Sequence, residues 1–198
     1  MNSLLLPIAG FAVAMYITPG PNNVMLASSG AHYGVRATVP HMFGIAAGFA
    51  VMLMAITAGL GTLLLVWPPL LSIMRWVGAA WMLYLAWKIA CAPTPGEGER
   101  RRLLGVAGAA GFQWINPKAW MIGLGASSMF ISPARPLWLQ VAQIGLVFAL
   151  AAFPCMLPWV LIGKGARFVL RSPWQFRAFN IAMALLLVAC LVPLLADG

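Results

Sequence analysis

Long apolar runs alternate with short polar or basic stretches along the whole chain. Each run is near or above the roughly 20 residues that a helix needs to cross a bilayer core of about 30 Å. The pattern predicts six membrane-spanning helices, at about Leu4–Leu26, His41–Val66, Leu70–Ala90, Leu103–Ile131, Leu137–Gly163 and Phe179–Leu195. We therefore expect an all-α polytopic membrane protein with a single transmembrane domain over residues 1–198.

Two of the apolar runs contain residues that cannot continue a helix. The first is interrupted by Thr18-Pro19-Gly20-Pro21-Asn22-Asn23, and the fourth by Asn116-Pro117-Lys118. A proline removes a backbone donor and clashes with the preceding turn. At membrane depth, the backbone groups that such a break frees are tolerated only against protein or a watery cavity. Paired interruptions in corresponding halves are typical of a transporter's binding site, although each one alone is also compatible with a structural kink.

Composition excludes a soluble protein, and this changes how the net positive charge is interpreted. Hydrophobic residues make up 63% of the chain and charged residues 8%, far from the usage of a soluble domain. A net charge of +9 would suggest nucleic acid as the partner of a soluble chain. Here the basic residues lie between apolar runs, as they do in membrane loops. We therefore expect a lipid bilayer and no nucleic acid as partner.

The distribution of basic residues predicts the orientation. With the N-terminus outside, the cytoplasmic loops hold nine basic residues and the opposite side two. The nine are Arg36, Lys88, Arg100, Arg101, Arg102, Lys164, Arg167, Arg171 and Arg177, against Arg75 and Arg135. Because basic residues gather on the cytoplasmic side, both termini should be external.

The same orientation divides the chain into two halves of opposite direction. The first repeat covers about residues 1–91, a polar cytoplasmic loop covers about 92–102, and the second repeat covers about 103–198. The two interrupted runs are the first of each half. We therefore expect an inverted repeat of three plus three helices.

The first break offers backbone groups to a ligand. It frees carbonyls before Pro19 and Pro21 and N–H groups at Asn22 and Asn23. A helix that begins near Pro21 would direct the positive end of its dipole at the break, which suits a carboxylate.

The second break carries a charged side chain. Inserting a lysine near the bilayer centre costs roughly 2.5–3.5 kcal/mol on insertion scales. Lys118 should therefore either have a function or extend its amine to the membrane interface. Its amine could pair with a substrate carboxylate or carry a proton. Gln113 and Asn116 are three residues apart and could share a face toward the same cavity. His41 is either an interfacial residue or a second proton carrier.

Acidic residues are absent from the apolar runs. The three acids of the chain are Glu97, Glu99 and Asp197. A carrier of divalent cations needs hard oxygen ligands, so this distribution disfavours a metal site. Cys91, Cys155 and Cys190 lack the C-x-x-C spacing of a redox or zinc site, and we expect no cofactor. If protons drive transport, then Lys118, His41 or the amine of the substrate must carry them.

Four motifs together resemble a known family. They are Thr18-Pro-Gly-Pro-Asn22, Gly34-Val-Arg36, Pro40-His41-x-x-Gly44 and Gly111-x-x-x-x-Asn116-Pro-Lys118. In this order they are similar to the LysE/RhtB superfamily of bacterial amino acid exporters, over essentially the whole chain. The resemblance implies six transmembrane helices in the inner membrane and export of amino acids or derivatives, driven by the proton-motive force, without enzymatic activity. Within the superfamily, Ala86-Trp-Lys-Ile-Ala90 and Phe112-Gln113 resemble the cysteine/O-acetylserine exporter branch.

The scarcity of acids favours a small neutral amino acid over a basic one as the substrate. The candidate binding residues are those around the two breaks: Thr18, Pro19, Gly20, Pro21, Asn22, Asn23, Gln113, Asn116, Pro117 and Lys118. Two other functions stay open at this point, namely export of another solute or a metal ion on the same scaffold, and a membrane component without transport. The sequence also leaves open whether copies of the chain form a homo-oligomer.

Overall fold

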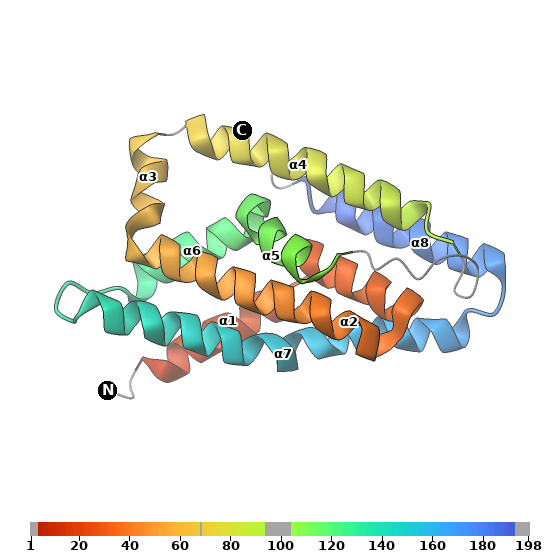
Figure 1. Cartoon of the computed structure of the whole chain (residues 1–198), viewed down its shortest axis with the longest axis horizontal. Coiled ribbons are helices and arrows are strands. Elements are labelled where there is room, and N and C mark those ends of the chain that lie inside the picture. The colour runs from red at the N-terminus through yellow and green to blue at the C-terminus, as the bar shows by residue number, and fades with distance from the viewer. Residues whose placement is uncertain (1–3, 68, 94–103, 193–198) are drawn as a thin grey trace.

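The computed structural model describes residues 4–67, 69–93 and 104–192, and every regular element among them is a helix (Figure 1). In chain order these are α1 (Leu5–Ile17), α2 (Pro21–Ala55), a π-helical segment (Ile56–Leu60), α3 (Gly61–Val66), α4 (Pro69–Ala90), α5 (Val106–Ile115), α6 (Pro117–Phe130), α7 (Leu137–Val169) and α8 (Pro173–Ala189). The expected central loop at 92–102, the first residues and the last residues fall largely or wholly outside the described ranges. The external placement of both termini therefore stays a prediction.

Both predicted helix breaks are confirmed. After α1 the backbone is extended at Gly20 (φ −178°, ψ 179°), and α2 begins at Pro21. After α5 the backbone is extended at Asn116 (φ −84°, ψ 108°), and α6 begins at Pro117. Proline is favoured at the first helical position because a backbone N–H there would have no helical partner, so its absence has no cost. In Figure 1, α5 and α6 follow one another along the molecule, as do α1 and the first part of α2.

A bend inside α2 makes the predicted start of the second apolar run wrong. The backbone of Gly34 adopts φ 77° and ψ 175°, a region that glycine enters without a steric penalty. The chain reverses direction there (Figure 1), and the helix continues directly from Val35. The second long helical stretch thus begins before Pro40 and His41, with the proline inside it.

Several other boundaries differ from the apolar pattern: the predicted run His41–Val66 is divided by the π-helical segment, and α8 ends at Ala189 and not at Leu195. The helix α4 matches the predicted run, whereas α7 extends past Gly163 to Val169. The helix α8 begins at Pro173 and not at Phe179 because Ser172 caps it. Its hydroxyl accepts from the backbone N–H of Gln175 at 3.4 Å, and the Gln175 side chain accepts in return from the N–H of Ser172 at 3.1 Å.

The helices are apolar on the outside as well as inside. Two stretches, Pro21–Leu63 with 43 residues and Leu137–Val169 with 33, are long and apolar enough to cross a membrane. Large side chains point outward, with Leu6 and Val66 each 81% exposed and Phe168 73% exposed. In water such surfaces would drive association, whereas lipid accommodates them. The fold is therefore that of a helical membrane protein.

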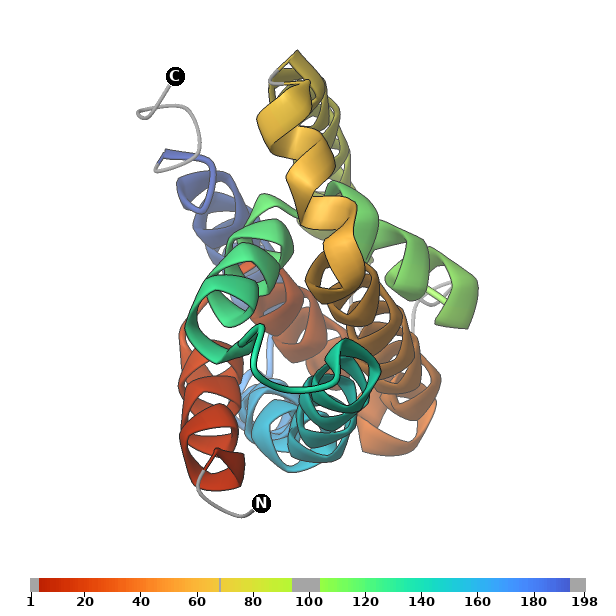
Figure 2. The same cartoon turned by 90° about the vertical axis from the view of Figure 1, so that its left-hand side faces the viewer.

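Close helix packing holds the two breaks in the middle of the molecule. In the end-on view of Figure 2, α7 lies between α1 and α2. Gly30 of α2 packs against the carbonyl of Val160, and Gly163 of α7 packs against the carbonyl of Ala27. Small residues let helix backbones approach in this way. A cluster of buried apolar residues joins the start of α2 to α4, α5 and α8. It includes Val24, Met25, Met82, Leu85, Phe112 and Leu187.

Basic residues cluster at one end of the long axis. The bend of α2, the ends of α4 and α7, and the beginning of α8 gather there, whereas the connection from α6 to α7 lies at the other end (Figure 1). Arg36 follows the bend, Lys88 lies in the last turn of α4, and Arg167 in the last turn of α7. The end with the α6–α7 connection carries Arg135.

Candidate functional site

The two helix breaks meet at Lys118. Its amine donates hydrogen bonds to the carbonyl oxygens of Thr18 at 2.5 Å and of Pro19 at 3.2 Å. These carbonyls lack helical partners because they lie in the non-helical stretch between the end of α1 at Ile17 and the start of α2 at Pro21. Gly20 lies directly beside the lysine, where a Cβ atom would come within 2.8 Å of Cδ and 2.9 Å of Nζ. The break therefore needs glycine at this position for space and not for a special backbone angle.

A reciprocal pair of amides forms a second link between the breaks. The Asn22 side chain donates to Oε1 of Gln113 at 2.9 Å, and Nε2 of Gln113 donates to Oδ1 of Asn22 at 3.2 Å. The same Gln113 nitrogen also donates to the carbonyl of Ala109 at 2.8 Å. Gln113 is fully buried, so its polar atoms depend on these partners.

Two asparagines satisfy the backbone groups that the breaks free. Asn23 donates from Nδ2 to the carbonyls of Tyr16 at 3.0 Å and Thr18 at 2.9 Å. Asn116 caps α6, because its side-chain oxygen accepts from the N–H of Lys118 at 3.2 Å. One sequence-based expectation is wrong here: the N–H of Asn23 is not free for a ligand, since it donates to the carbonyl of Gly20 at 3.0 Å.

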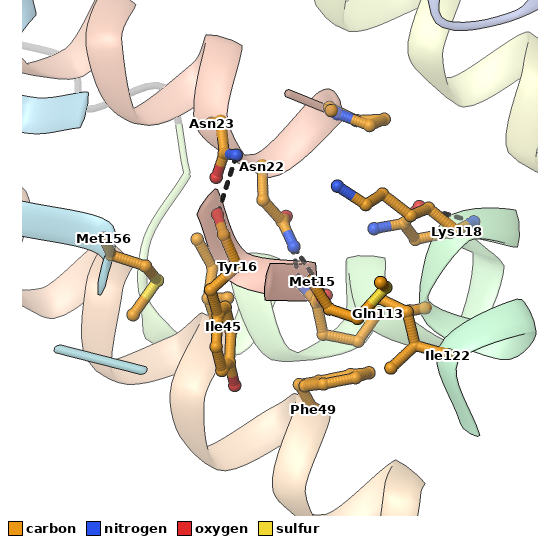
Figure 3. Close-up of a pocket in the computed structure, with 14 residues that line it drawn as sticks. Met15, Tyr16, Asn22, Asn23, Ile45, Phe49, Gln113, Lys118, Ile122 and Met156 are labelled. Atoms are coloured by element: carbon orange, nitrogen blue, oxygen red, sulfur yellow. Dashed lines mark hydrogen bonds between the residues drawn. The ribbon is translucent and has the colours of Figure 1, made fainter. Parts of the chain in front are cut away.

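A pocket opens between the breaks and has two unlike ends (Figure 3). The polar part is lined by Gly20, Pro21, Asn22, Asn23, Gln113, Asn116 and Lys118. The remaining lining residues are mostly apolar: Met15, Tyr16, Ile45, Phe49, Ala119, Ile122 and Met156. The cavity volume is about 30 Å³. That is room for one or two water molecules and less than an amino acid occupies, so the pocket is nearly closed in this conformation.

The polar part of the pocket is electrostatically positive. The helices α2 and α6 both begin there, at Pro21 and Pro117, so the positive ends of two helix dipoles converge beside the Lys118 amine. None of the fourteen lining residues is acidic. Such a site favours an anion, and a carboxylate fits the hydrogen-bond donors that surround it.

Seven of the ten predicted binding residues line the pocket, and the other three support it. Thr18 and Pro19 present their carbonyls to Lys118, and Pro117 starts α6. His41, the other proposed proton carrier, is not among the lining residues. It is buried at 2% exposure, and its Nδ1 lies 3.3 Å from the hydroxyl of Ser29. The proton-coupling role of His41 and the binding role of the others stay predictions.

Sequence reasoning missed the apolar part of the pocket. Ile45 and Phe49 come from the second half of α2, Ile122 from α6 and Met156 from α7. Apolar residues inside apolar runs carry no local pattern that separates a pocket lining from a lipid-facing or core position. Tyr16, a polar aromatic residue two positions before Thr18, is the one member whose residue type offered a signal, and it was not predicted.

Comparison with known proteins gives a consistent answer. The family profile of the LysE type translocators matches residues 13–198. The chain is 34% identical over 177 residues to the cysteine/O-acetylserine efflux protein of Salmonella typhimurium, and 31% identical over 177 residues to that of Escherichia coli K12. Each alignment covers 89% of this chain and 89% of the relative. No solved structure matches the chain.

Proposed function

This chain belongs to the LysE family of translocators, and we propose that it exports small neutral amino acids or their derivatives from the cytoplasm. As a member of that family it is a transporter and not an enzyme, and it is a multi-pass protein of the bacterial inner membrane. Its relatives are named for efflux of cysteine and O-acetylserine, both of them small amino acids without a net side-chain charge.

The observation that carries this proposal is the meeting of the two breaks at Lys118. A lysine amine and two helix N-terminal ends are directed into one pocket, and each favours a negative group. The substrate carboxylate binds at this polar part, between Lys118 and the first turn of α2. Asn22 and Gln113 contact its remaining polar atoms.

The rest of the pocket supports a neutral side chain. Met15, Phe49, Ile122 and Met156 make its surface mainly apolar, and the lining offers no carboxylate for a basic side chain. A lysine or arginine substrate would bury a cation there without a partner, which is costly in a low-dielectric site.

Binding exchanges internal hydrogen bonds for bonds to the substrate. In the closed pocket the Lys118 amine is satisfied by the carbonyls of Thr18 and Pro19, and Asn22 is satisfied by Gln113. A carboxylate replaces these partners without leaving the lysine unpaired. Because the closed cavity is smaller than an amino acid, the helices on either side of the breaks must separate to admit it.

An inverted repeat of three plus three helices accounts for such an opening. Helix α1 packs on α7, as α5 packs on α2, and α4 packs on α8. In an inverted repeat, α1 corresponds to α5, α2 to α7 and α4 to α8. Exchanging the two halves then turns the α1–α7 contact into the α5–α2 contact and leaves the α4–α8 contact unchanged, as expected for a two-fold axis between the halves. The cluster of basic residues at one end of the molecule supports a cytoplasmic location for that end.

Export is coupled to protons through groups other than carboxylates. Lys118 lies in the pocket itself, whereas His41 lies outside the lining, in contact with Ser29. Protonation of Lys118 would set the affinity for a carboxylate directly, so we assign it the primary role.

An export assay tests the proposal. Cells that lack their own exporters are fed alanine-, serine- or lysine-containing dipeptides, and the free amino acid in the medium is followed with and without expression of this protein. Alanine and serine should rise severalfold with expression, and lysine should not. If the amount of each amino acid in the medium is the same with and without the protein, export of this substrate class is refuted.

A further inference from the structure

The hydroxyl group of Tyr16 is a buried polar atom that the described fold leaves without a partner. The side chain is 8% exposed, and its oxygen has no hydrogen-bond partner among the described residues. Buried hydroxyl groups normally have a partner, because burial without one is unfavourable. Tyr16 also lines the pocket between the breaks. An unsatisfied donor at the wall of a binding pocket points to a ligand atom as its partner.

Packing alone does not explain a tyrosine at this position. The Tyr16 ring meets the ring of Phe49 edge-on, with centroids 5.9 Å apart, and lies 6.0 Å from that of Phe148. A phenylalanine ring would make the same contacts. The backbone carbonyl of Tyr16 holds Asn23, and any residue would supply that carbonyl. The hydroxyl is therefore the one part of the residue that neither the core nor the break uses.

The Tyr16 side chain extends away from the polar part of the pocket, toward the side where the substrate side chain would lie. In Figure 3 it points toward Phe49, whereas Lys118 and Gln113 lie on the other side of the pocket. A carboxylate bound at Lys118 directs the side chain of the same molecule away from the polar part. Ile45 and Phe49, which lie beside Tyr16 in Figure 3, offer no hydrogen bond to a polar side-chain group.

We propose that the Tyr16 hydroxyl donates a hydrogen bond to the side chain of the substrate and so selects small neutral amino acids whose side chain contains an acceptor. Hydroxyl, ester and amide oxygens on a short side chain satisfy this requirement, and an alkyl side chain does not. The inference rests on the proposed function, because it assumes that the carboxylate binds at Lys118. A site built to form such a bond discriminates against an analogue that lacks the acceptor.

Serine and 2-aminobutyrate test the inference because they differ only by a hydroxyl in place of a methyl group. The protein is reconstituted in liposomes, and the affinity for each compound is measured by competition against counterflow of labelled alanine. The wild type should bind serine about fivefold to tenfold more tightly than 2-aminobutyrate, as expected for one hydrogen bond. Y16F should remove that preference and leave the affinity for 2-aminobutyrate within twofold.

The controls separate this inference from the proposed function. Y84F removes a hydroxyl from a tyrosine that is 49% exposed and should change neither affinity. A wild-type protein that binds both compounds equally, or a Y16F variant that keeps the serine preference, overturns the inference but leaves amino acid export intact. If neither compound competes with alanine and alanine itself shows no counterflow, the proposed function is what fails. Should Y16F not accumulate in membranes, the wild-type comparison decides alone, and equal affinities overturn the inference.

Discussion

The amine of Lys118 lies 2.5 Å from the carbonyl oxygen of Thr18, one hundred residues away in the chain. This contact joins the second helix break to the first. It supplies a donor for a carbonyl that lies between α1 and α2 and belongs to neither helix, and it gives a lysine inside an apolar segment a polar partner. When a carboxylate takes the place of the carbonyl, the lysine keeps a polar partner and the Thr18 carbonyl keeps the hydrogen bond from Asn23.

Gly20→Ala should impair export with little effect on folding. The new Cβ atom would lie 2.8 Å from Cδ of Lys118, so the lysine side chain must move away from the Thr18 carbonyl. The extended backbone at position 20 is accessible to alanine, and the lysine side chain is flexible, so the unfolding temperature should hardly change. We expect a severalfold lower export rate, measured in cells with matched amounts of protein. Gly111→Ala is the control, since nothing lies within 4 Å of a Cβ there, and a loss of export equal to that of Gly20→Ala would contradict the explanation.

Asn22 and Gln113 should behave as a coupled pair. Removing either side chain leaves the other amide in the pocket without its partner, at a cost of about 1–3 kcal/mol. Asn22→Ala and Gln113→Ala should therefore each lower the thermal stability of the substrate-free protein. The double variant should be at least as stable as the less stable of the two single variants. Effects that simply add in this double-mutant cycle would show that the two amides act independently.

Gly163→Ala should destabilise the packing of α7 on α2. The added methyl group would collide with the carbonyl of Ala27 and the N–H of Ala31, which are backbone atoms and cannot rotate away. Overpacking of this kind costs about 1–3 kcal/mol, so the unfolding midpoint in detergent should fall by several degrees. Gly165→Ala, two residues later, meets nothing within 4 Å and should leave the midpoint unchanged. Identical midpoints for the two variants would be evidence against the close helix crossing.

Local sequence rules accounted for the helices and for the breaks, but not for the path between them. Pro19 and Pro21 flank a glycine, and Pro117 follows an asparagine that caps α6, so these breaks could be predicted where they occur in the chain. Proline alone is not sufficient, because Pro40, Pro154 and Pro158 lie inside helices. The bend at Gly34 could not, because glycine within an apolar helix is common and only tertiary packing selects a positive φ. The start of α8 was missed for a different reason: the capping pattern of Ser172, Pro173 and Gln175 is local, but it lies outside the apolar run.

The same distinction holds for the pocket. Asn22, Gln113 and Lys118 were predicted as binding residues because polar side chains are unfavourable in apolar runs unless they have a function or a partner. That they contact one another could not be deduced, since the contacts depend on how α5 and α6 pack against α1 and α2. Phe49 and Met156 enter the lining only through the crossing of α2 and α7, which no periodicity in either segment indicates.

The proposed orientation predicts which residues are accessible from outside the cell. Cys91 is exposed at the end of α4, on the cytoplasmic side of the proposed arrangement. In a protein carrying Cys155→Ala and Cys190→Ala, Cys91 should react with a membrane-impermeant maleimide only after the membrane is permeabilised. Ala134→Cys, in a background without the native cysteines, should react in intact spheroplasts. The reverse labelling pattern would place the basic end of the molecule outside.

The central claim is that Lys118 holds the carboxylate of the substrate. Alanine and alaninamide distinguish it most directly, because they differ in that one group. In liposomes that contain the wild-type protein, alanine should compete for transport far better than alaninamide. Lys118→Met should lower the affinity for alanine by more than about tenfold, as expected for loss of a charged hydrogen bond, and should bind both compounds alike. Lys164→Met, which changes an exposed lysine near the end of α7, should behave like the wild type. A Lys118→Met protein that still binds alanine with wild-type affinity and still rejects alaninamide would contradict the account.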